Sequence, residues 1–298
     1  MFILFAEQDA TAALTHFRRA TELNPHSAQA WLHMAEAQMV NGDTEAALRA
    51  VDRAVQTEPQ TPAVAWTAAN LLIALGETKR GLSHLRFAMA HDPELIRPAL
   101  ELVHRVQRNP VDAAEDALPP DPVAYFSYMN LLIAHGELDS VRALWMKFVA
   151  LSKPFKLRYA FGPFEAFLKA GDARMLQHFW NDVERLVPDA ARLHTGQNAI
   201  RNASFEYDIL NGGLDWRNRE VSGVLLQNDD SEYHEGRHSL VATFAMEPVG
   251  DLGLHQYVVL EPNTQYRFTG YMKPVLESAH GPRFALINIT NQSRYFVT

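Results

Sequence analysis

Three short stretches decide the fold of the first part of the chain: ELNPHS (22–27), QTEPQT (56–61) and AHDPEL (90–95). They place three prolines at equal intervals of 34 residues, namely Pro25, Pro59 and Pro93. A period of this length predicts repeated pairs of helices that stack on one another. Because proline cannot continue a helix, each of these prolines is expected to follow the second helix of a pair.

Other positions keep the same period. Two of them carry small residues and a third carries larger apolar residues; these are Ala13, Ala47 and Gly81, then Ala20, Ala54 and Ala88, and then Phe17, Val51 and Leu85. Small residues let two helices approach closely, and larger ones fill the space between them. Gly42 and Gly76 are typical of the turn between paired helices.

These features, together with Trp31 in AWLHMAEAQMVNGD (30–43), resemble the tetratricopeptide repeat family. The resemblance implies an α-solenoid of helical hairpins that binds a protein or peptide on its concave face. The third repeat is looser, since Trp66 is shifted by one residue. Only residues 2–8 remain for a first helix, so we expect a fragment of a longer protein, or an end covered by a partner or a neighbouring copy.

A longer identity lies further along the chain. NLLIALGE (70–77) reappears as NLLIAHGE (130–137), at an offset of 60 rather than the 68 of two full repeats. The unit between them is therefore irregular. NPVDAAEDALPPDP (109–122) is rich in proline and acidic residues and predicts a break or an extended connection. Helical hairpins are expected at 1–108 and, in degenerate form, at 123–192.

The apolar spacing changes from helical to alternating after Arg201. Three runs predict strands joined by turns: HSLVATF (238–244), HQYVVLEP (255–262) and QYRFTGYMKP (265–274). Residues 198–298 resemble jelly-roll modules of the galactose-binding and carbohydrate-binding type. The residues that carry this resemblance are Asn202, Phe205, Glu206, Trp216, Gly236, Ser239, Leu240, Gln256, Pro262 and Tyr266.

The expected fold class is therefore multidomain, α then β. A solenoid of tetratricopeptide-like hairpins comes first, and the resemblance implies a β-sandwich jelly roll after it. GPRFALINITNQSRYFVT (281–298) stops before a closing strand, so we expect an incomplete sandwich with an unpaired edge.

Composition excludes several classes of function. The formal net charge is −8 and the sequence pI is about 5.9, which argues against a nucleic-acid partner. Cysteine is absent, so disulfides and thiolate sites are excluded, and no apolar run is long enough for a transmembrane segment. MFILFAEQDA (1–10) lacks the basic region of a secretory signal. The compartment stays open: cytoplasmic or, if the N-terminus is truncated, extracytoplasmic.

HEGRH (234–238) matches the H-E-x-x-H signature of zinc metalloproteases. That chemistry needs a helix, because only a helical turn aims both histidines at one metal ion. Gly236 and the turn-rich residues before the motif predict a turn instead. A metalloprotease would require this stretch to be helical and metal-bound, and no nucleophile elbow, phosphate loop or dinucleotide fingerprint suggests another enzyme.

An aromatic residue precedes an asparagine by four positions in both NLLIA runs: Trp66 with Asn70, and Phe126 with Asn130. Four residues make one helical turn, so ring and amide share a face. The resemblance implies that this face lines the concave groove, where the amide can bond a peptide backbone and the ring can pack its side chains. In the alternative interpretation, the rings belong to the core and the amides bond within the stack. Weaker groove candidates are His33, Glu36 and Gln29.

Aromatic residues of the last third are candidates for sugar binding, since rings stack on the apolar faces of sugars. They are Trp216, Tyr207, Tyr233 and Tyr257. The alternative is that they fill the core or rim of the sandwich. The resemblance also implies a structural calcium ion near Glu206, with Asp229 and Asp230 as weaker ligands; no other cofactor is expected.

The predicted function is that of a non-enzymatic scaffold or adaptor. It would bind a protein or peptide through the repeat groove and carry an accessory jelly-roll module. The alternative is a polysaccharide-binding or glycan-binding protein that is linked to the export or assembly of surface polysaccharide.

Overall fold

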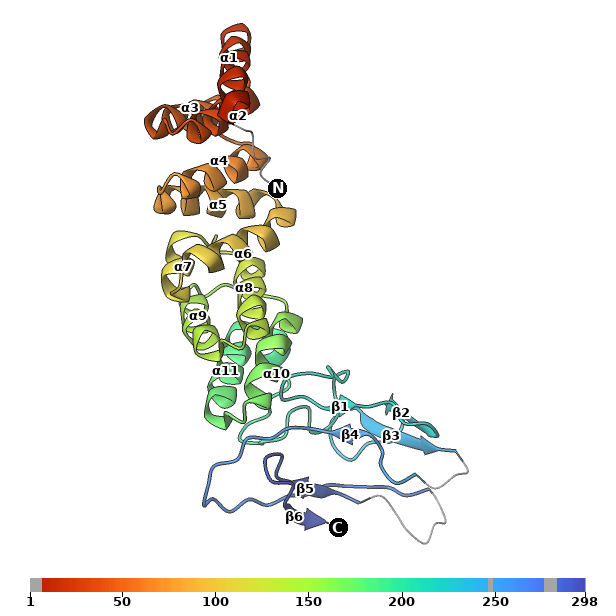
Figure 1. Cartoon of the computed structure of the whole chain (residues 1–298). Coiled ribbons are helices and arrows are strands. Elements are labelled where there is room, and N and C mark those ends of the chain that lie inside the picture. The colour runs from red at the N-terminus through yellow and green to blue at the C-terminus, as the bar shows by residue number, and fades with distance from the viewer. Residues whose placement is uncertain (1–6, 246–248, 276–282, 298) are drawn as a thin grey trace. The chain divides into compact units, whose positions relative to one another are not determined.

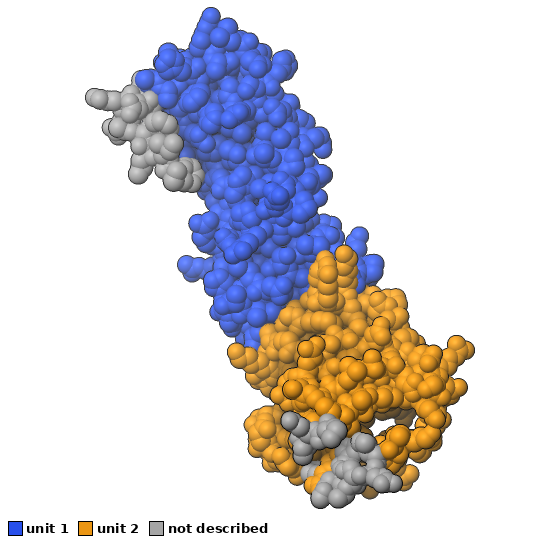
Figure 2. Space-filling view, turned by 90° about the vertical axis from the view of Figure 1, so that its right-hand side faces the viewer, with its two compact units in different colours: residues 1–155 blue, residues 156–298 orange. Residues whose placement is uncertain are grey.

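The computed structural model describes residues 7–245, 249–275 and 283–297. The chain divides into two compact units, residues 1–155 and residues 156–298, which Figure 2 shows in separate colours. In its described part, unit 1 is entirely helical, whereas unit 2 combines helices with short strands.

Unit 1 is a series of helices joined by short turns (Figure 1). Its helices are α1 (Glu7–Leu23), α2 (Ala28–Val40), α3 (Thr44–Thr57), α4 (Pro62–Ala74), α5 (Thr78–His91), the 3₁₀ helix η1 (Pro93–Leu95), α6 (Ile96–Val106), α7 (Pro110–Asp116), α8 (Pro122–Ala134) and α9 (Leu138–Ala150). Consecutive helices pack as pairs, α2 with α3, α4 with α5 and α8 with α9, and α2 also contacts α4 while α6 contacts α8. The predicted helical repeat solenoid is confirmed. The short first helix expected at 2–8 falls mostly outside the described residues, which begin with α1 at Glu7.

The alanines and glycines of the repeat are buried between helices and form turns, respectively, as their spacing predicts. Ala47, Ala54 and Ala88 are fully buried where paired helices meet. Gly42 and Gly76 end the first helices of their pairs with φ angles of 79° and 89°, a conformation that costs glycine little. No helix among the described residues is long and apolar enough to cross a bilayer.

The segment 109–122 differs from the extended connection that its prolines predict. Residues 110–116 form the helix α7, because Pro110 occupies its first position and the side chain of Asn109 accepts a 2.9 Å hydrogen bond from the backbone N–H of Val111. Ala113 is fully buried in the stack. At 7 residues, α7 is half the length of α3 and α5, which have 14 each. This short second helix explains the offset of 60 between the two NLLIA runs.

Unit 2 begins with helices and continues with strands. Its elements are η2 (Leu157–Ala160), α10 (Phe161–Lys169), α11 (Ala173–Leu186), α12 (Pro188–Ala191), β1 (Arg217–Asn218), β2 (Val224–Asp229), β3 (Ser239–Phe244), β4 (Leu254–His255), β5 (Ala285–Ile287) and β6 (Arg294–Val297). The strands form three separate antiparallel pairs, β1 with β4, β2 with β3 and β5 with β6. In the longest pair, Val224 lies opposite Phe244 and Asp229 opposite Ser239.

A complete jelly roll is not observed among the described residues. The run 238–244 forms β3 as predicted, but only His255 of the second run lies in a strand, and the third run, 265–274, contains none. Phe268 is 47% exposed and Tyr271 is 71% exposed. Large apolar side chains in this part therefore have no second sheet to bury them, which a sandwich requires.

Helices α10 to α12 belong to the same compact unit as the strands, whereas the sequence predicts a boundary near residue 198. The guanidinium of Arg201 donates to the carboxylate of Glu184 on α11 at 2.6 Å, and Arg217 pairs with Glu165 on α10. Arg201 is 4% exposed. These ion pairs connect the helices to the chain that follows them.

Candidate functional site

The first helix of each pair presents three equivalent positions that are not buried. Because the positions are spaced by four and then three residues, they share one face of the helix. We call each set a stripe: Gln29, His33 and Glu36 on α2; Ala63, Thr67 and Asn70 on α4; Arg97, Glu101 and His104 on α6; Val123, Ser127 and Asn130 on α8. The first three stripes are related by 34 residues, and those of α4 and α8 by 60. The repeat therefore places these side chains at the same register in four helices.

The last positions of the α4 and α8 stripes are the predicted asparagines. Nδ2 of Asn70 donates a 2.8 Å hydrogen bond to the backbone carbonyl of Trp66, one turn earlier. This bond orients the amide and leaves its oxygen available as an acceptor. Asn130 is exposed, and its side chain bonds to no residue that the structure describes. Both amides can therefore accept hydrogen bonds from a ligand, and both can also donate, since Asn70 keeps the second N–H of its Nδ2 group.

The two predicted aromatic partners differ from each other. Trp66 is only partly buried, next to Asn70 on α4. Phe126 is 2% exposed, and its ring lies 5.1 Å from that of Phe148 and 4.9 Å from that of Phe155, centroid to centroid. The expectation that Phe126 lines a groove is therefore wrong. Its ring is part of the aromatic core of unit 1, and burial of so large a ring stabilises the fold.

The α2 stripe is linked by its own side chains. Nδ1 of His33 lies 3.2 Å from the Glu36 carboxylate, and Nε2 lies 3.4 Å from the Gln29 amide nitrogen. The imidazole also stacks on the ring of Phe17 at a centroid distance of 5.3 Å. His33 and Glu36 thus already have hydrogen-bond partners within the stripe.

His104 is a stripe residue that sequence reasoning missed, although it lies 34 residues after Asn70. Its ring stacks on that of His135 at 4.7 Å, and its Nε2 lies 3.5 Å from the carboxylate of Glu137. The ring of Tyr128 lies edge-on at 6.5 Å. Burial, reinforced by the charge of Glu137, raises the pKa of Tyr128 to about 12, so its hydroxyl keeps its proton. The stripe of α6 is therefore connected to α8 and to the turn after it.

Two of the predicted sugar-binding rings are engaged within unit 2. The indole Nε1–H of Trp216 donates a 3.1 Å hydrogen bond to the carbonyl of Asn202, and the indole stacks on Phe205 at 5.1 Å. The Arg217 guanidinium covers the ring of Tyr257 at 5.0 Å. Each of these rings has one face covered by the protein itself.

The other two predicted rings, Tyr207 and Tyr233, are exposed. The Arg192 guanidinium stacks over Tyr207 at 4.7 Å, and Tyr207 is 36% exposed. Tyr233 is 52% exposed, in the loop between β2 and β3. Within the described part of the chain the four rings do not stack on one another, so nothing in their geometry favours a shared sugar platform.

HEGRH lies in a turn, as its glycine predicts. An oxygen of Glu206 accepts hydrogen bonds from the backbone N–H groups of Arg237 (2.9 Å) and His238 (3.2 Å), which lowers the pKa of Glu206. A Cβ on Gly236, whose φ is 80°, would lie 2.0 Å from the same carboxylate. The ring of His234 stacks on that of Tyr271 at a centroid distance of 3.4 Å, whereas Nδ1 of His238 lies 3.4 Å from the Glu206 carboxylate.

These contacts do not fit a bound metal. The Glu206 carboxylate is surrounded by N–H donors rather than by the oxygen ligands that calcium prefers. Within the described residues, no group of three His, Asp or Glu side chains could hold a metal ion. Glu206 therefore holds the 234–238 turn in place, and the expected calcium ligand set, including Asp229 and Asp230, is not assembled around it.

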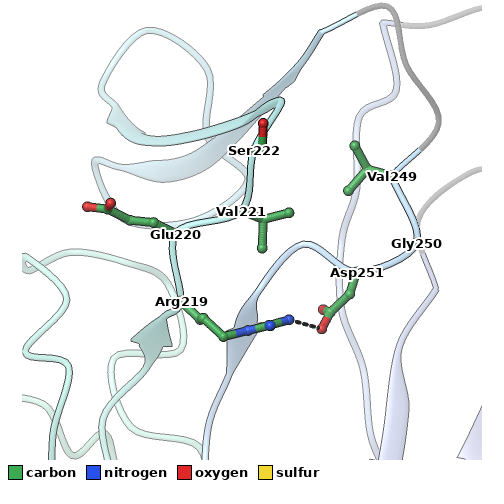
Figure 3. Close-up of a pocket in the computed structure, with 7 residues that line it drawn as sticks. All are labelled: Arg219, Glu220, Val221, Ser222, Val249, Gly250 and Asp251. Carbon is green, nitrogen blue, oxygen red and sulfur yellow. Dashed lines mark hydrogen bonds and ion pairs between the residues drawn. The ribbon is translucent and has the colours of Figure 1, made fainter.

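A shallow hollow of about 420 Å³ lies between residues 219–222 and residues 249–251 (Figure 3). Across it, the Arg219 guanidinium points toward the Asp251 carboxylate, with a hydrogen bond of 2.7 Å. A neighbouring hollow of about 540 Å³ shares Glu220, Val221 and Ser222 with it. Because Arg219 and Asp251 form an ion pair with each other, neither charge is available to bind a ligand in the hollow.

Residues 4–71 match the family model described as Tetratricopeptide repeat. The N-terminal region therefore carries tetratricopeptide repeats, as its period of 34 residues indicated. The match covers less than half of the chain, and no curated protein matches the chain.

Several solved structures are also similar to the chain at low sequence identity. YrrB, described as a TPR protein with an unusual peptide-binding site, is 15% identical, with 58% of this chain and 93% of YrrB covered, at a TM-score of 0.29. MamA is 14% identical, with coverage of 60% and 90% and a TM-score of 0.27. PilF of Pseudomonas aeruginosa is 17% identical, with coverage of 61% and 86% and a TM-score of 0.25.

Proposed function

We propose that the protein is a non-enzymatic scaffold that binds an extended peptide segment of a partner protein across the stripes of α2, α4, α6 and α8. One observation carries the proposal: α4 and α8 hold an asparagine amide at the same register, and neither amide oxygen is used by a described hydrogen bond. An extended peptide has unpaired backbone N–H and C=O groups that such amides can bond. Trp66, partly exposed beside Asn70, supplies an aromatic surface for peptide side chains.

The repeat architecture supports this function. Stacked hairpins create an extended surface on which several units contact one ligand at once. Peptide recognition by such a surface needs positioned hydrogen-bond groups on rigid helices, and the stripes supply hydroxyl, amide, imidazole and carboxylate groups. The polysaccharide alternative has no comparable support, because the sugar-binding candidates Trp216 and Tyr257 are engaged within unit 2.

The test is selection of short random peptides on the full chain, followed by calorimetric titration of a selected peptide. We expect Asn70→Ala combined with Asn130→Ala to weaken binding about tenfold, because two hydrogen bonds to the ligand are lost. Gln56→Ala on α3 is the matched control: it removes an exposed amide from a second helix and should leave the affinity unchanged. Circular dichroism establishes that each variant is folded.

Failure to select any peptide, or equal affinity of the double asparagine variant and the wild type, would remove the proposal. In either case the stripes would be an ordinary solvated face of the solenoid.

A further inference from the structure

The stripes carry few formal charges, and those charges lie on the stripes of α2 and α6. Only Glu36, Arg97 and Glu101 are formally charged among the stripe positions. Glu36 lies 3.2 Å from His33, and Arg97 lies 3.3 Å from Glu101. Glu36 is therefore hydrogen-bonded to His33, Arg97 is paired with Glu101, and the stripes of α4 and α8 contain no formal charge at all.

The cations of unit 1 lie mainly on its other helices. Helices α2, α4 and α8 contain no lysine or arginine. Their partners do, with Arg18 and Arg19 on α1, Arg49 and Arg53 on α3, Lys79, Arg80 and Arg86 on α5, and Arg142 and Lys147 on α9. The nearby cations Arg105 and Arg108 lie at and just after the C-terminal end of α6, where helix carbonyls favour positive charge. The positive charge of the unit is thus concentrated away from the stripes.

The remaining stripe residues are small, apolar or neutral and polar, as Ala63, Thr67, Val123 and Ser127 illustrate. A charged side chain that docked on the stripes of α4 or α8 would lose water without gaining a counter-charge from them. A neutral peptide loses much less hydration, and its backbone still gains hydrogen bonds from Asn70 and Asn130. The chemistry of the surface therefore favours one class of occupant.

We propose that the segment bound across the stripes is an extended peptide without charged side chains in its central part, held through its backbone. This inference rests on the proposed function and specifies the partner. Binding depends on hydrogen bonds and apolar contact rather than on ion pairs, so it is insensitive to salt over the range that screens surface charges.

The experiment uses the peptides selected on the full chain and reads their composition and the salt dependence of their binding. Selected peptides are expected to be depleted in Asp, Glu, Lys and Arg relative to the starting library. The affinity of one selected peptide should change less than about twofold between about 0.05 M and about 0.5 M NaCl. Placing a lysine or an aspartate at the centre of that peptide should weaken binding about tenfold in either case.

The outcomes separate this inference from the proposed function. Peptides that require Asn70 and Asn130 but are rich in one sign of charge, or whose affinity falls more than about tenfold with salt, would overturn the inference and leave the scaffold function standing. Thr67→Lys is a second variant: a lysine in the neutral stripe should shift selection toward acidic peptides. Selection unaffected by this new cation would also contradict the inference. Absence of any peptide that depends on the two asparagines would remove both proposals.

Discussion

Gly213 packs directly against the indole ring of Trp180. A Cβ at this position would lie 1.9 Å from Cη2 and 2.1 Å from Cζ3 of the indole, and the backbone φ is 61°. Trp180 is fully buried on α11 and cannot move away without opening the core. Only a residue without a side chain fits between the helix and the chain that follows it.

We expect Gly213→Ala to destabilise unit 2 by about 3 kcal/mol or more, because a steric clash adds to backbone strain. Gly196→Ala is the matched control: its φ is 57°, but nothing lies within 4 Å of the added Cβ, so only the strain of about 1 kcal/mol remains. The two variants are compared in the full chain by hydrogen exchange, with mass spectrometry of peptides from α11 at increasing urea concentrations. Equal losses of protection would show that the Trp180 contact does not limit stability.

At the scale of the elements, α11 is held to the segment after α12 by an ion pair that is almost fully buried. The side chains of Arg201 and Glu184 are 5% and 10% exposed. The second oxygen of Glu184 lies 3.0 Å from Nδ1 of His194, and the backbone N–H of Arg201 donates to the side chain of Gln256 at 2.9 Å. One arginine therefore connects a helix, a loop and the residues just after β4.

Replacing Arg201 by alanine is expected to cost about 3 to 5 kcal/mol, because it leaves the Glu184 carboxylate buried without its counter-charge. Arg19→Ala, which breaks the exposed pair with Glu22, should cost less than about 1 kcal/mol. Differential scanning calorimetry measures both. If Arg201→Met with Glu184→Leu recovers none of the loss, the destabilisation does not come from the unpaired charge.

At the scale of the whole molecule, the boundary between the compact units falls after Phe155 rather than after the last helix. The strand pairs are short, and the large side chains that the structure describes after residue 260 remain exposed, such as Phe268, Tyr271 and Ile289. Small two-stranded pairs are marginal in water unless they pack against something else. Trp180, Glu184 and Glu165 contact Gly213, Arg201 and Arg217, so α10 and α11 pack against the chain that leads into β1 and against β1 itself. We therefore expect these helices to stabilise the strand region.

A fragment of residues 156–298 should therefore fold, whereas residues 198–298 alone should not, because they lack the helices that bury Gly213, Arg201 and Arg217. Amide-proton NMR spectra of the two fragments, with residues 1–155 as a folded reference, measure this difference. Well-dispersed spectra of the shorter fragment would mean that the strand region is an independent domain.

Much of unit 1 could be predicted from the sequence, because the contacts that form each hairpin join residues close along the chain. The two helices of a hairpin bury small residues at a fixed spacing against each other. The burial of Ala47 and Ala54 could therefore be predicted from their place in the repeat. The same logic locates Asn70 and, at one further period, His104. The length of α7 could not be obtained in this way, since capping by Asn109 and packing of Ala113 outweigh the disruptive composition of the segment.

The sequence by itself determined the repeat, its helix pairs and the register of the stripes, because each depends on contacts between residues close along the chain. Only the tertiary structure decided that Phe126 is core, that Glu206 holds a turn rather than a metal, and that α10 to α12 join the strands. Each of these outcomes depends on partners outside the local hairpin or turn, such as Phe155 for Phe126 and Arg237 for Glu206. Residue type and spacing do not specify such partners, because burial and hydrogen bonding are settled only when distant segments pack together.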